Sequence, residues 1–162
     1  MKKTQIEKIY KENAVPANII RHMQKVSEVA ELLIKKFKEA GVSLNEELII
    51  TACLVHDVMR LKEDNKSVNH ALLMGAYLSR TGEDELAALV TKHHFEHIDD
   101  LENWEEKIVY YSDKRVAHDR IVSLKERFTE IGERIAYRNP ELEKKVFELE
   151  QEIKNVIGPL PV

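Results

Sequence analysis

The sequence has few of the residues that interrupt helices or cross-link a chain. Its 162 residues include only five glycines, four prolines and one cysteine. A single cysteine, Cys53, excludes an intrachain disulfide and a cysteine-rich zinc site, and it favours a reducing, cytoplasmic compartment. The scarcity of glycine and proline predicts long, uninterrupted helices.

Long apolar runs and a strong charge of one sign are also lacking. Nowhere do about 18 apolar residues stand together, so no membrane span is predicted, and the N-terminus lacks the apolar run of a signal peptide. The formal net charge of −4 gives no electrostatic reason to bind bulk nucleic acid or an anionic membrane. With 43% hydrophobic and 33% charged residues, the chain is expected to form one domain over residues 1–162.

What the sequence does contain is a series of apolar stripes at helical spacing. The stripe over residues 16–41 predicts a long helix, and His22 lies on its inward face. Asn45 is suited to cap a second helix, apolar nearly all round, which is therefore expected to be buried on most sides. This second helix ends at His56 and Asp57.

Three further helices are expected to direct polar groups inward. One begins near Ser67, another near Asp84, and a third follows a capping-box pattern at Asn103 and Glu106. Their polar residues on the inner stripes or at the helix ends are His70, His93, His94 and Asp113.

The last quarter of the chain has two amphipathic patterns. Apolar residues predict one helix that starts at Ile121 and a second over residues 142–153, joined around Asn139-Pro140. We interpret residues 120–157 as a C-terminal helical hairpin. Its apolar stripe has to pack on something, so the hairpin is either a homodimer surface or a lid over a site. The predicted fold class is all-α.

The inward polar residues form a candidate metal site. Charged or partly charged groups on apolar stripes are costly to bury unless they are paired or bind a metal. Imidazole and carboxylate together favour a divalent transition metal, one or two per chain, from among Mn, Fe, Co, Ni and Zn, over Mg. A metal lowers the pKa of a bound water, and an aspartate that bridges two metals can hold the hydroxide between them. The sequence therefore predicts attack by water on a substrate.

The same residues also have purely structural explanations. A single inward histidine, such as His22 or His70, is more often a hydrogen-bonded core residue than a metal ligand. Asp57 and Asp113 can instead cap helices or form ion pairs with nearby arginines. A second His-Asp dipeptide, at residues 118–119, follows no buried helix and is left out of the predicted site.

The set His22, His56-Asp57 and Asp113 resembles the H…HD…D signature of the HD-domain metal-dependent phosphohydrolases. The resemblance covers about residues 16–120, and the spaced set is more specific than an HD dipeptide alone. The segments HALLMGAYL and TKHHFE resemble the H…GA and HH elements of the HDIG-type branch. The resemblance implies an HD-domain helical bundle that holds one metal through His22, His56, Asp57 and Asp113, and a second site, bridged by Asp57, that is completed by His70 and His93 with His94 assisting.

The chain departs from the patterns of this superfamily in two respects. Where members often read HDIGK, residues 56–60 read HDVMR, so Met59 replaces a glycine and Arg60 replaces a lysine expected to contact phosphate. Arginine can make that contact through its planar guanidinium. Asn18 is not a carboxylate and no GYP segment follows His94, which argues against the three-metal cyclic-dinucleotide phosphodiesterases of the superfamily.

Cations next to the predicted ligands indicate a phosphate-containing substrate, unless the lysines among them simply lie in water. These cations are Arg60, Lys92, Lys114 and Arg115. We predict hydrolysis of a phosphomonoester or phosphodiester of a nucleotide or related small molecule, with Asp57, Arg60 and His93 as catalytic residues. Two alternatives stay open: a di-iron oxygenase and a non-catalytic nucleotide-binding or regulatory module. The expected pocket walls are Met59, Tyr77, Phe95, Tyr110 and Tyr111.

Overall fold

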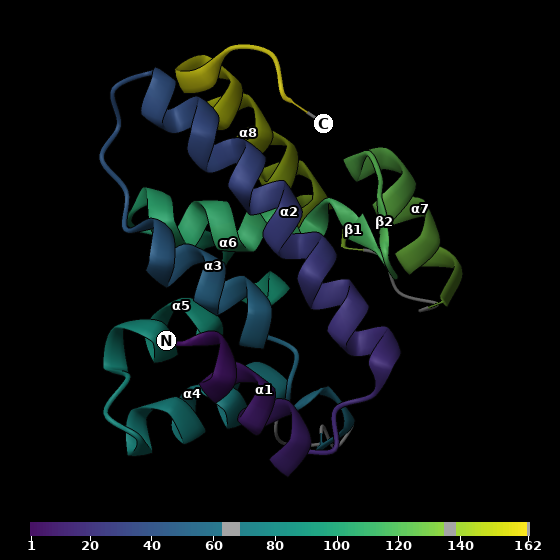
Figure 1. Ribbon diagram of the computed structural model, residues 1–162. Coiled ribbons are helices and arrows are strands. Elements are labelled where there is room, and N and C mark those ends of the chain that lie inside the picture. Colours follow the sequence, from purple (N-terminus) through teal and green to yellow (C-terminus); the bar gives the residue numbers. More distant parts are fainter. Residues whose placement is uncertain (63–68, 135–138, 162) are drawn as a thin grey trace.

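Helices make up nearly all of the regular structure in the computed structural model, which describes residues 1–62, 69–134 and 139–161 (Figure 1). In chain order they are α1 (Lys3–Glu12), α2 (Ala17–Glu39), α3 (Glu46–Val55), the 3-10 helix η1 (Arg60–Lys62), α4 (His70–Arg80), α5 (Asp84–Thr91), the 3-10 helix η2 (Phe95–Asp100), α6 (Trp104–Lys114), α7 (Leu124–Arg134) and α8 (Pro140–Ile157). The predicted all-α class is confirmed. Within the described ranges, no helix is both long and apolar enough to cross a membrane.

Asparagine caps set the starts of four helices. The side chains of Asn45, Asn103 and Asn139 accept hydrogen bonds of 3.2, 2.9 and 3.2 Å from the backbone N–H three residues later. Such caps satisfy amide groups that the first turn leaves unpaired. Asn69 caps α4 in the same way, so that helix begins at His70, whereas the predicted start near Ser67 lies outside the described residues.

Helix α2 crosses the molecule and contacts elements from both halves of the chain (Figure 1). It packs on α3, α6 and α8 and on both strands of the small sheet. Its inner face buries a nearly continuous apolar stripe, and the helix is followed by Gly41 at a φ of 82°, a left-handed conformation that glycine adopts without strain. The helix predicted over residues 16–41 is therefore present, with His22 in its first half.

Helices α4 and α5 approach each other closely at Gly75. A Cβ atom on Gly75 would lie 2.1 Å from Thr91 Oγ1 and 3.4 Å from the carbonyl oxygen of Ala87. His70 is the first residue of α4, and His93 lies just after α5. The close packing at Gly75 therefore helps to set the distance between these two imidazoles.

Replacing Gly75 with alanine should test this contact. We expect Gly75→Ala to lower the free energy of unfolding by about 1 to 3 kcal/mol, because a methyl group there overpacks against Thr91. The double variant Gly75→Ala/Thr91→Ala should recover most of the loss, because the two sites are in contact. Urea denaturation of the wild type, both single variants and the double variant measures the coupling. If the double variant is no more stable than the sum of the two single changes in free energy of unfolding predicts, this explanation is wrong.

A short β hairpin precedes α7. Strands β1 (Val116–Ala117) and β2 (Arg120–Ile121) pair antiparallel around a turn in which His118 has a φ of 58°. The prediction that Ile121 starts a helix is wrong, because the turn at His118 brings this residue back along β1 and α7 begins only at Leu124.

The two predicted C-terminal helices are present as α7 and α8. Helix α8 packs against α2, α6 and η2, whereas α7 contacts β1. The rings of Phe128 and Phe147 connect the two helices, with centroids 5.9 Å apart. The apolar stripe of α8 is buried within the chain, so it is covered without a second copy; the homodimer stays a prediction. Ile135 lies outside the described residues.

The charged N-terminal segment forms a helix that the sequence analysis did not predict. Ile6 and Ile9 of α1 are buried, each 6% exposed, and the hydroxyl of Tyr10 donates to the carbonyl oxygen of Leu54. Two isoleucines three residues apart were the available signal, but ten residues of mostly polar sequence form a helix in water only weakly without tertiary packing.

Candidate metal centre

Six polar side chains from five parts of the chain converge beneath the surface. Five of them are at most 9% exposed, and the side chain of His22 is 12% exposed. They are His22 of α2, His56 and Asp57 just after α3, His70 of α4, His93 just after α5 and Asp113 of α6. Since α3 is buried on most sides, as predicted, it delivers the His-Asp pair directly into the interior.

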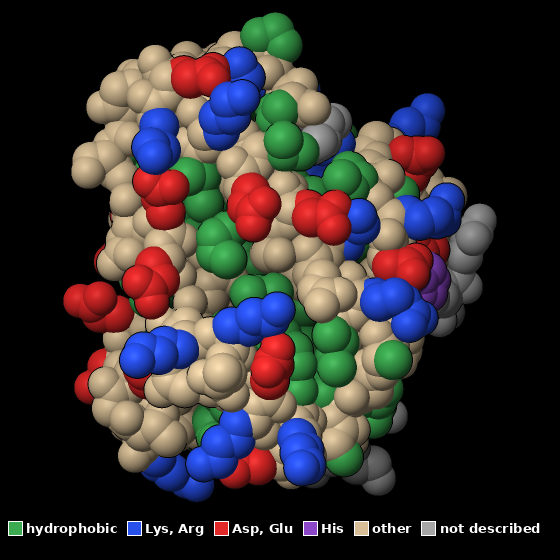
Figure 2. Space-filling view, viewed as in Figure 1, with side chains coloured by type: hydrophobic (Ala, Val, Ile, Leu, Met, Phe, Trp, Pro, Cys, Tyr) green, Lys and Arg blue, Asp and Glu red, His purple; other side chains and the backbone are tan. Residues whose placement is uncertain are grey.

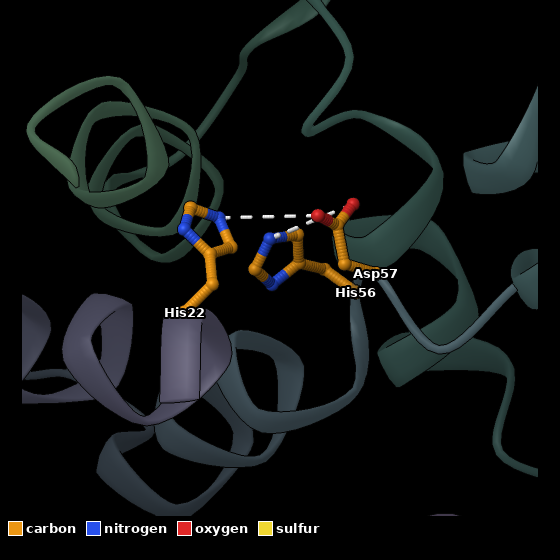
Figure 3. Close-up of side chains that lie close together, drawn as sticks. All are labelled: His22, His56 and Asp57. Atoms are coloured by element: carbon orange, nitrogen blue, oxygen red, sulfur yellow. Dashed lines mark ion pairs between the residues drawn. The ribbon is translucent and has the colours of Figure 1, made fainter. Parts of the chain in front are cut away.

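The first group of ligand atoms comes from His22, His56, Asp57 and Asp113. Nε2 of His22 lies 3.1 Å from Asp113 Oδ1 and 3.9 Å from Asp57 Oδ2. Nε2 of His56 lies 3.6 Å from the same Asp113 oxygen and 3.9 Å from Asp57 Oδ1. Figure 3 shows both imidazoles directed at the Asp57 carboxylate from neighbouring elements.

The second group comes from Asp57, His70 and His93. Asp57 Oδ1 lies 2.9 Å from His70 Nε2 and 3.7 Å from His93 Nε2. The two Nε2 atoms are 3.1 Å apart. Asp57 therefore belongs to both groups, with Oδ2 toward His22 and Oδ1 toward His70.

Backbone carbonyl groups orient three of the four imidazoles. Nδ1 of His56 and of His93 lies 2.8 and 2.5 Å from the carbonyl oxygen three residues earlier, and Nδ1 of His22 lies 2.7 Å from that of His118. A proton donated to these carbonyls sits on Nδ1, which leaves the Nε2 lone pair directed into the cluster. Nε2 of His56 is buried and has no hydrogen-bond partner among the described residues.

These donors fit a divalent metal. Ligands held about 2.0 to 2.2 Å from one ion lie roughly 3 Å from each other, close to the 3.1 Å between His22 and Asp113 and between His70 and His93. A metal would also satisfy the buried Nε2 of His56. Mixed imidazole and carboxylate donors suit Mn, Fe, Co, Ni or Zn.

The two carboxylates are held in their ionised form. Burial acts to raise the pKa of Asp57, but the imidazoles of His56, His70 and His93 around the carboxylate outweigh burial and hold that pKa well below its usual value. For Asp113, burial is likewise outweighed by the Lys114 ammonium, and its pKa is also well below the usual value. Both groups are therefore available as anionic ligands at neutral pH.

The state of His93 makes the stability of the metal-free protein depend on pH. Burial lowers the pKa of His93 to about 4, from 6.5. Between these values the unfolded chain binds a proton that the folded protein does not, so the free energy of unfolding should fall as the pH is lowered from 6.5 to 4. The loss is at most about 3 kcal/mol.

Urea denaturation of chelator-treated protein at several pH values between 4 and 7 measures this dependence. His93→Gln should flatten the curve over this range. His22 does not contribute to this dependence. Burial acts to lower the pKa of His22, but Asp113 outweighs burial, so the pKa of His22 is raised. The stabilisation from His22 is therefore complete below pH 6.5 and is lost only as the pH rises through the raised pKa. Parallel curves for wild type and His93→Gln would contradict the assignment.

Lys114 supports the ligands from behind. Its Nζ donates to Asp113 Oδ2 at 2.7 Å and to the carbonyl oxygen of His93 at 2.8 Å. It also lies over the rings of Phe95 and Tyr110, 4.2 and 4.5 Å from their centroids. Because Lys114 is only 2% exposed, it orients Asp113 and does not face a substrate as its position in the sequence suggested.

Two other predicted phosphate contacts are also directed away from the site. Lys92 Nζ lies 2.8 Å from Glu106 Oε1, and Arg115 is buried, donating to the carbonyl oxygen of Val122. Arg60 is different, because its side chain is 43% exposed and its Nη1 lies 3.4 and 3.5 Å from the Asp57 oxygens.

A pocket of about 500 Å³ opens onto the first group of ligands. Its walls come from α2, η1, the β hairpin turn and α7, and they include Arg21, Arg60, His118, Asp119 and Arg127 beside His22 and Asp57. The expected wall residues Met59, Tyr77, Phe95, Tyr110 and Tyr111 are not among its lining residues. In Figure 2, histidine is visible at the right edge of the molecule, near α7, among charged side chains.

The second His-Asp dipeptide belongs to this pocket, contrary to the sequence analysis. The His118 carbonyl accepts from His22, and Asp119 pairs with Arg21 at 3.3 Å. The available signal was the closeness of the dipeptide to Asp113 in the sequence. His94 lies outside both ligand groups: its side chain is 31% exposed, and its ring centroid is 6.1 Å from that of His70.

The fold and the site together define an all-α protein with a buried cluster of imidazole and carboxylate groups that is compatible with a divalent metal. Residues 19–124, more than half of the chain, match the family model described as HD domain. The chain belongs to the HD domain family, as its signature predicted. The comparisons with curated proteins and with solved structures returned no match.

Proposed function

We propose that this protein is a metal-dependent phosphohydrolase that cleaves a phosphomonoester or phosphodiester of a nucleotide or related small molecule. The observation that carries the proposal is the arrangement of two ligand groups that share Asp57 at the base of an arginine-lined pocket. Membership of the HD domain family supports it, because HD domains are typically metal-dependent phosphohydrolases.

The protein side chains have separate roles in this proposal. The first group would hold one divalent ion, and the second group, completed by His70 and His93, would hold another. A bound metal supplies a water of lowered pKa and polarises the phosphoryl oxygens. The Asp57 carboxylate lies beside imidazoles of both groups, so it would contribute to both sites.

Arg60 is placed to bind the phosphoryl group that reacts. Its guanidinium reaches the Asp57 oxygens and lines the pocket, and two parallel N–H donors match two phosphoryl oxygens. When the water oxygen bonds to phosphorus, the bond to the leaving oxygen breaks and that oxygen takes up a proton. Arg60 would stabilise the charge that develops on the phosphoryl oxygens.

Metal content and turnover together test the proposal. Freshly purified protein, without a histidine tag or chelator, should contain one or two equivalents of Mn, Fe, Co, Ni or Zn by elemental mass spectrometry. A phosphatase and phosphodiesterase screen with that metal should then give turnover.

Other results would replace the proposal. No metal, and none taken up on reconstitution, would mean that the cluster is a hydrogen-bond network. Nearly two equivalents of iron with oxygen consumption would favour a di-iron oxygenase. Tight nucleotide binding without turnover across all these metals would favour a binding or regulatory module.

A further inference from the structure

The pocket has more arginines than carboxylates in its lining. Three arginines line it, together with the carboxylates of Asp57 and Asp119. Asp119 is paired with Arg21 at 3.3 Å, and Asp57 faces the ligand groups. Arg60 already lies 3.4 and 3.5 Å from the Asp57 oxygens, so the lining contains one arginine more than it has carboxylates, although the whole chain has a net charge of −4.

Arg127 has hydrogen-bonding capacity that the protein leaves unused. Its side chain is 11% exposed, and its Nε is buried without a hydrogen-bond partner among the described residues. Its Nη1 lies 3.8 Å from Glu130 Oε2, beyond normal hydrogen-bond length, while the other oxygen of Glu130 lies 3.1 Å from His118 Nε2. Leaving a buried N–H unpaired is costly, so the Arg127 guanidinium is poorly satisfied by the protein, and its side chain lines the pocket, where its charge is available to a bound anion.

The position of Arg127 separates it from the arginine beside the metal ligands. Arg60 belongs to η1 and reaches the Asp57 carboxylate, whereas Arg127 belongs to α7, after the residues 19–124 that match the HD domain. Both line the same pocket of about 500 Å³, a volume typical of small-molecule sites. Ile19 and Leu61 add apolar surface to its wall.

We propose that Arg127 binds a second phosphoryl group of the substrate. The substrate class is then a phosphate ester or anhydride with at least two phosphoryl groups, such as a nucleoside diphosphate. Arg60 contacts the phosphoryl group at the ligand cluster, and Arg127 contacts the one that is not attacked. This inference rests on the proposed phosphohydrolase function.

Binding of two non-hydrolysable probes tests the role of Arg127 without turnover. Methylenediphosphonate has two phosphoryl groups, and methylphosphonate has one. Calorimetric titration of the metal-loaded full chain should show that Arg127→Gln weakens the binding of methylenediphosphonate about 10- to 100-fold, the loss expected for a charge-assisted hydrogen bond. The affinity for methylphosphonate should change less than about threefold. Metal content measured after each titration controls for removal of metal by the probe.

Two further variants separate a binding role from a structural one. Lys125→Gln changes an exposed cation of the same helix and should bind both probes as the wild type does. Arg127→Lys keeps the charge but not the planar fork, so it should lose part of the affinity for methylenediphosphonate alone. This variant decides the matter if Arg127→Gln does not fold.

The outcomes distinguish this inference from the proposed function. Equal losses for both probes, or no loss for either, would overturn the role of Arg127. If the wild type hydrolyses phosphate esters while Arg127→Gln and Arg127→Lys bind both probes normally, the proposed function stands and the role of Arg127 is wrong. If binding of methylenediphosphonate depends on Arg127 but the wild type hydrolyses no ester, only the proposed function is wrong.

Discussion

Asp57→Asn is expected to lower kcat/KM by at least about 10³-fold and to remove bound metal, while the protein stays folded. Asp57 is the one residue shared by both ligand groups, with one oxygen 2.9 Å from His70 and the other 3.9 Å from His22. Even residues that only support a metal ligand change affinity or activity 10- to 100-fold when replaced, so loss of a shared anionic ligand should cost more. The amide keeps the shape of the side chain and removes its charge.

The chain offers a matched control in its second His-Asp dipeptide. Asp119→Asn makes the same chemical change at the pocket wall, where the carboxylate pairs with Arg21 and not with the ligand groups. Elemental mass spectrometry should find metal in Asp119→Asn and none in Asp57→Asn, and circular dichroism should show both folded. Turnover by folded, metal-free Asp57→Asn would refute the proposed function.

Three of the helices that the sequence predicted carry their own start signals. Asn45, Asn103 and Asn139 each precede an apolar stripe, and each caps a helix in the structure. Helix α1 lacks such a signal and depends on packing of Ile6 and Ile9. Strand β2 was missed because its pairing with β1 depends on a turn that no local apolar pattern marks.

The histidines and aspartates of the site were predictable because helical periodicity determines which side chains face the core. The direction in which the neighbouring lysines and arginines point was not predictable from the sequence. Neighbouring residues on a helix point about 100° apart, so Lys114 faces the back of the Asp113 carboxylate although it is next in sequence. Adjacency to a ligand in the sequence is therefore weak support for a substrate contact.

The pocket wall depends on contacts between distant parts of the chain. The carbonyl of His118 orients His22 across 96 positions of sequence, and α7 brings Arg127 to the same pocket. No periodicity or cap relates these positions to one another. They become visible only when the β hairpin and α7 are placed beside α2.

Lys114→Met should destabilise the metal-free protein by about 3 to 5 kcal/mol. The substitution removes the ammonium 2.7 Å from Asp113 Oδ2 and leaves a carboxylate buried without its main countercharge. The pKa of Asp113 should rise in the variant. Its stability difference from the wild type should therefore be largest at neutral pH and should shrink as the pH falls through that raised pKa.

Metal should reverse part of this loss, because a bound cation neutralises Asp113 from the opposite side. Binding of metal only to the folded state raises the free energy of unfolding with metal concentration. We expect the metal affinity itself to fall about 10- to 100-fold, since Lys114 holds Asp113 in the orientation that presents Oδ1 to His22 and His56. Urea denaturation with and without Mn²⁺ measures both effects. Lys107 lies in the same helix as Lys114 and pairs with the half-exposed Glu152. The control variant Lys107→Met should therefore change the free energy of unfolding by no more than about 1 kcal/mol. Equal stability losses in Lys114→Met and Lys107→Met would show that Lys114 does not balance the charge of Asp113.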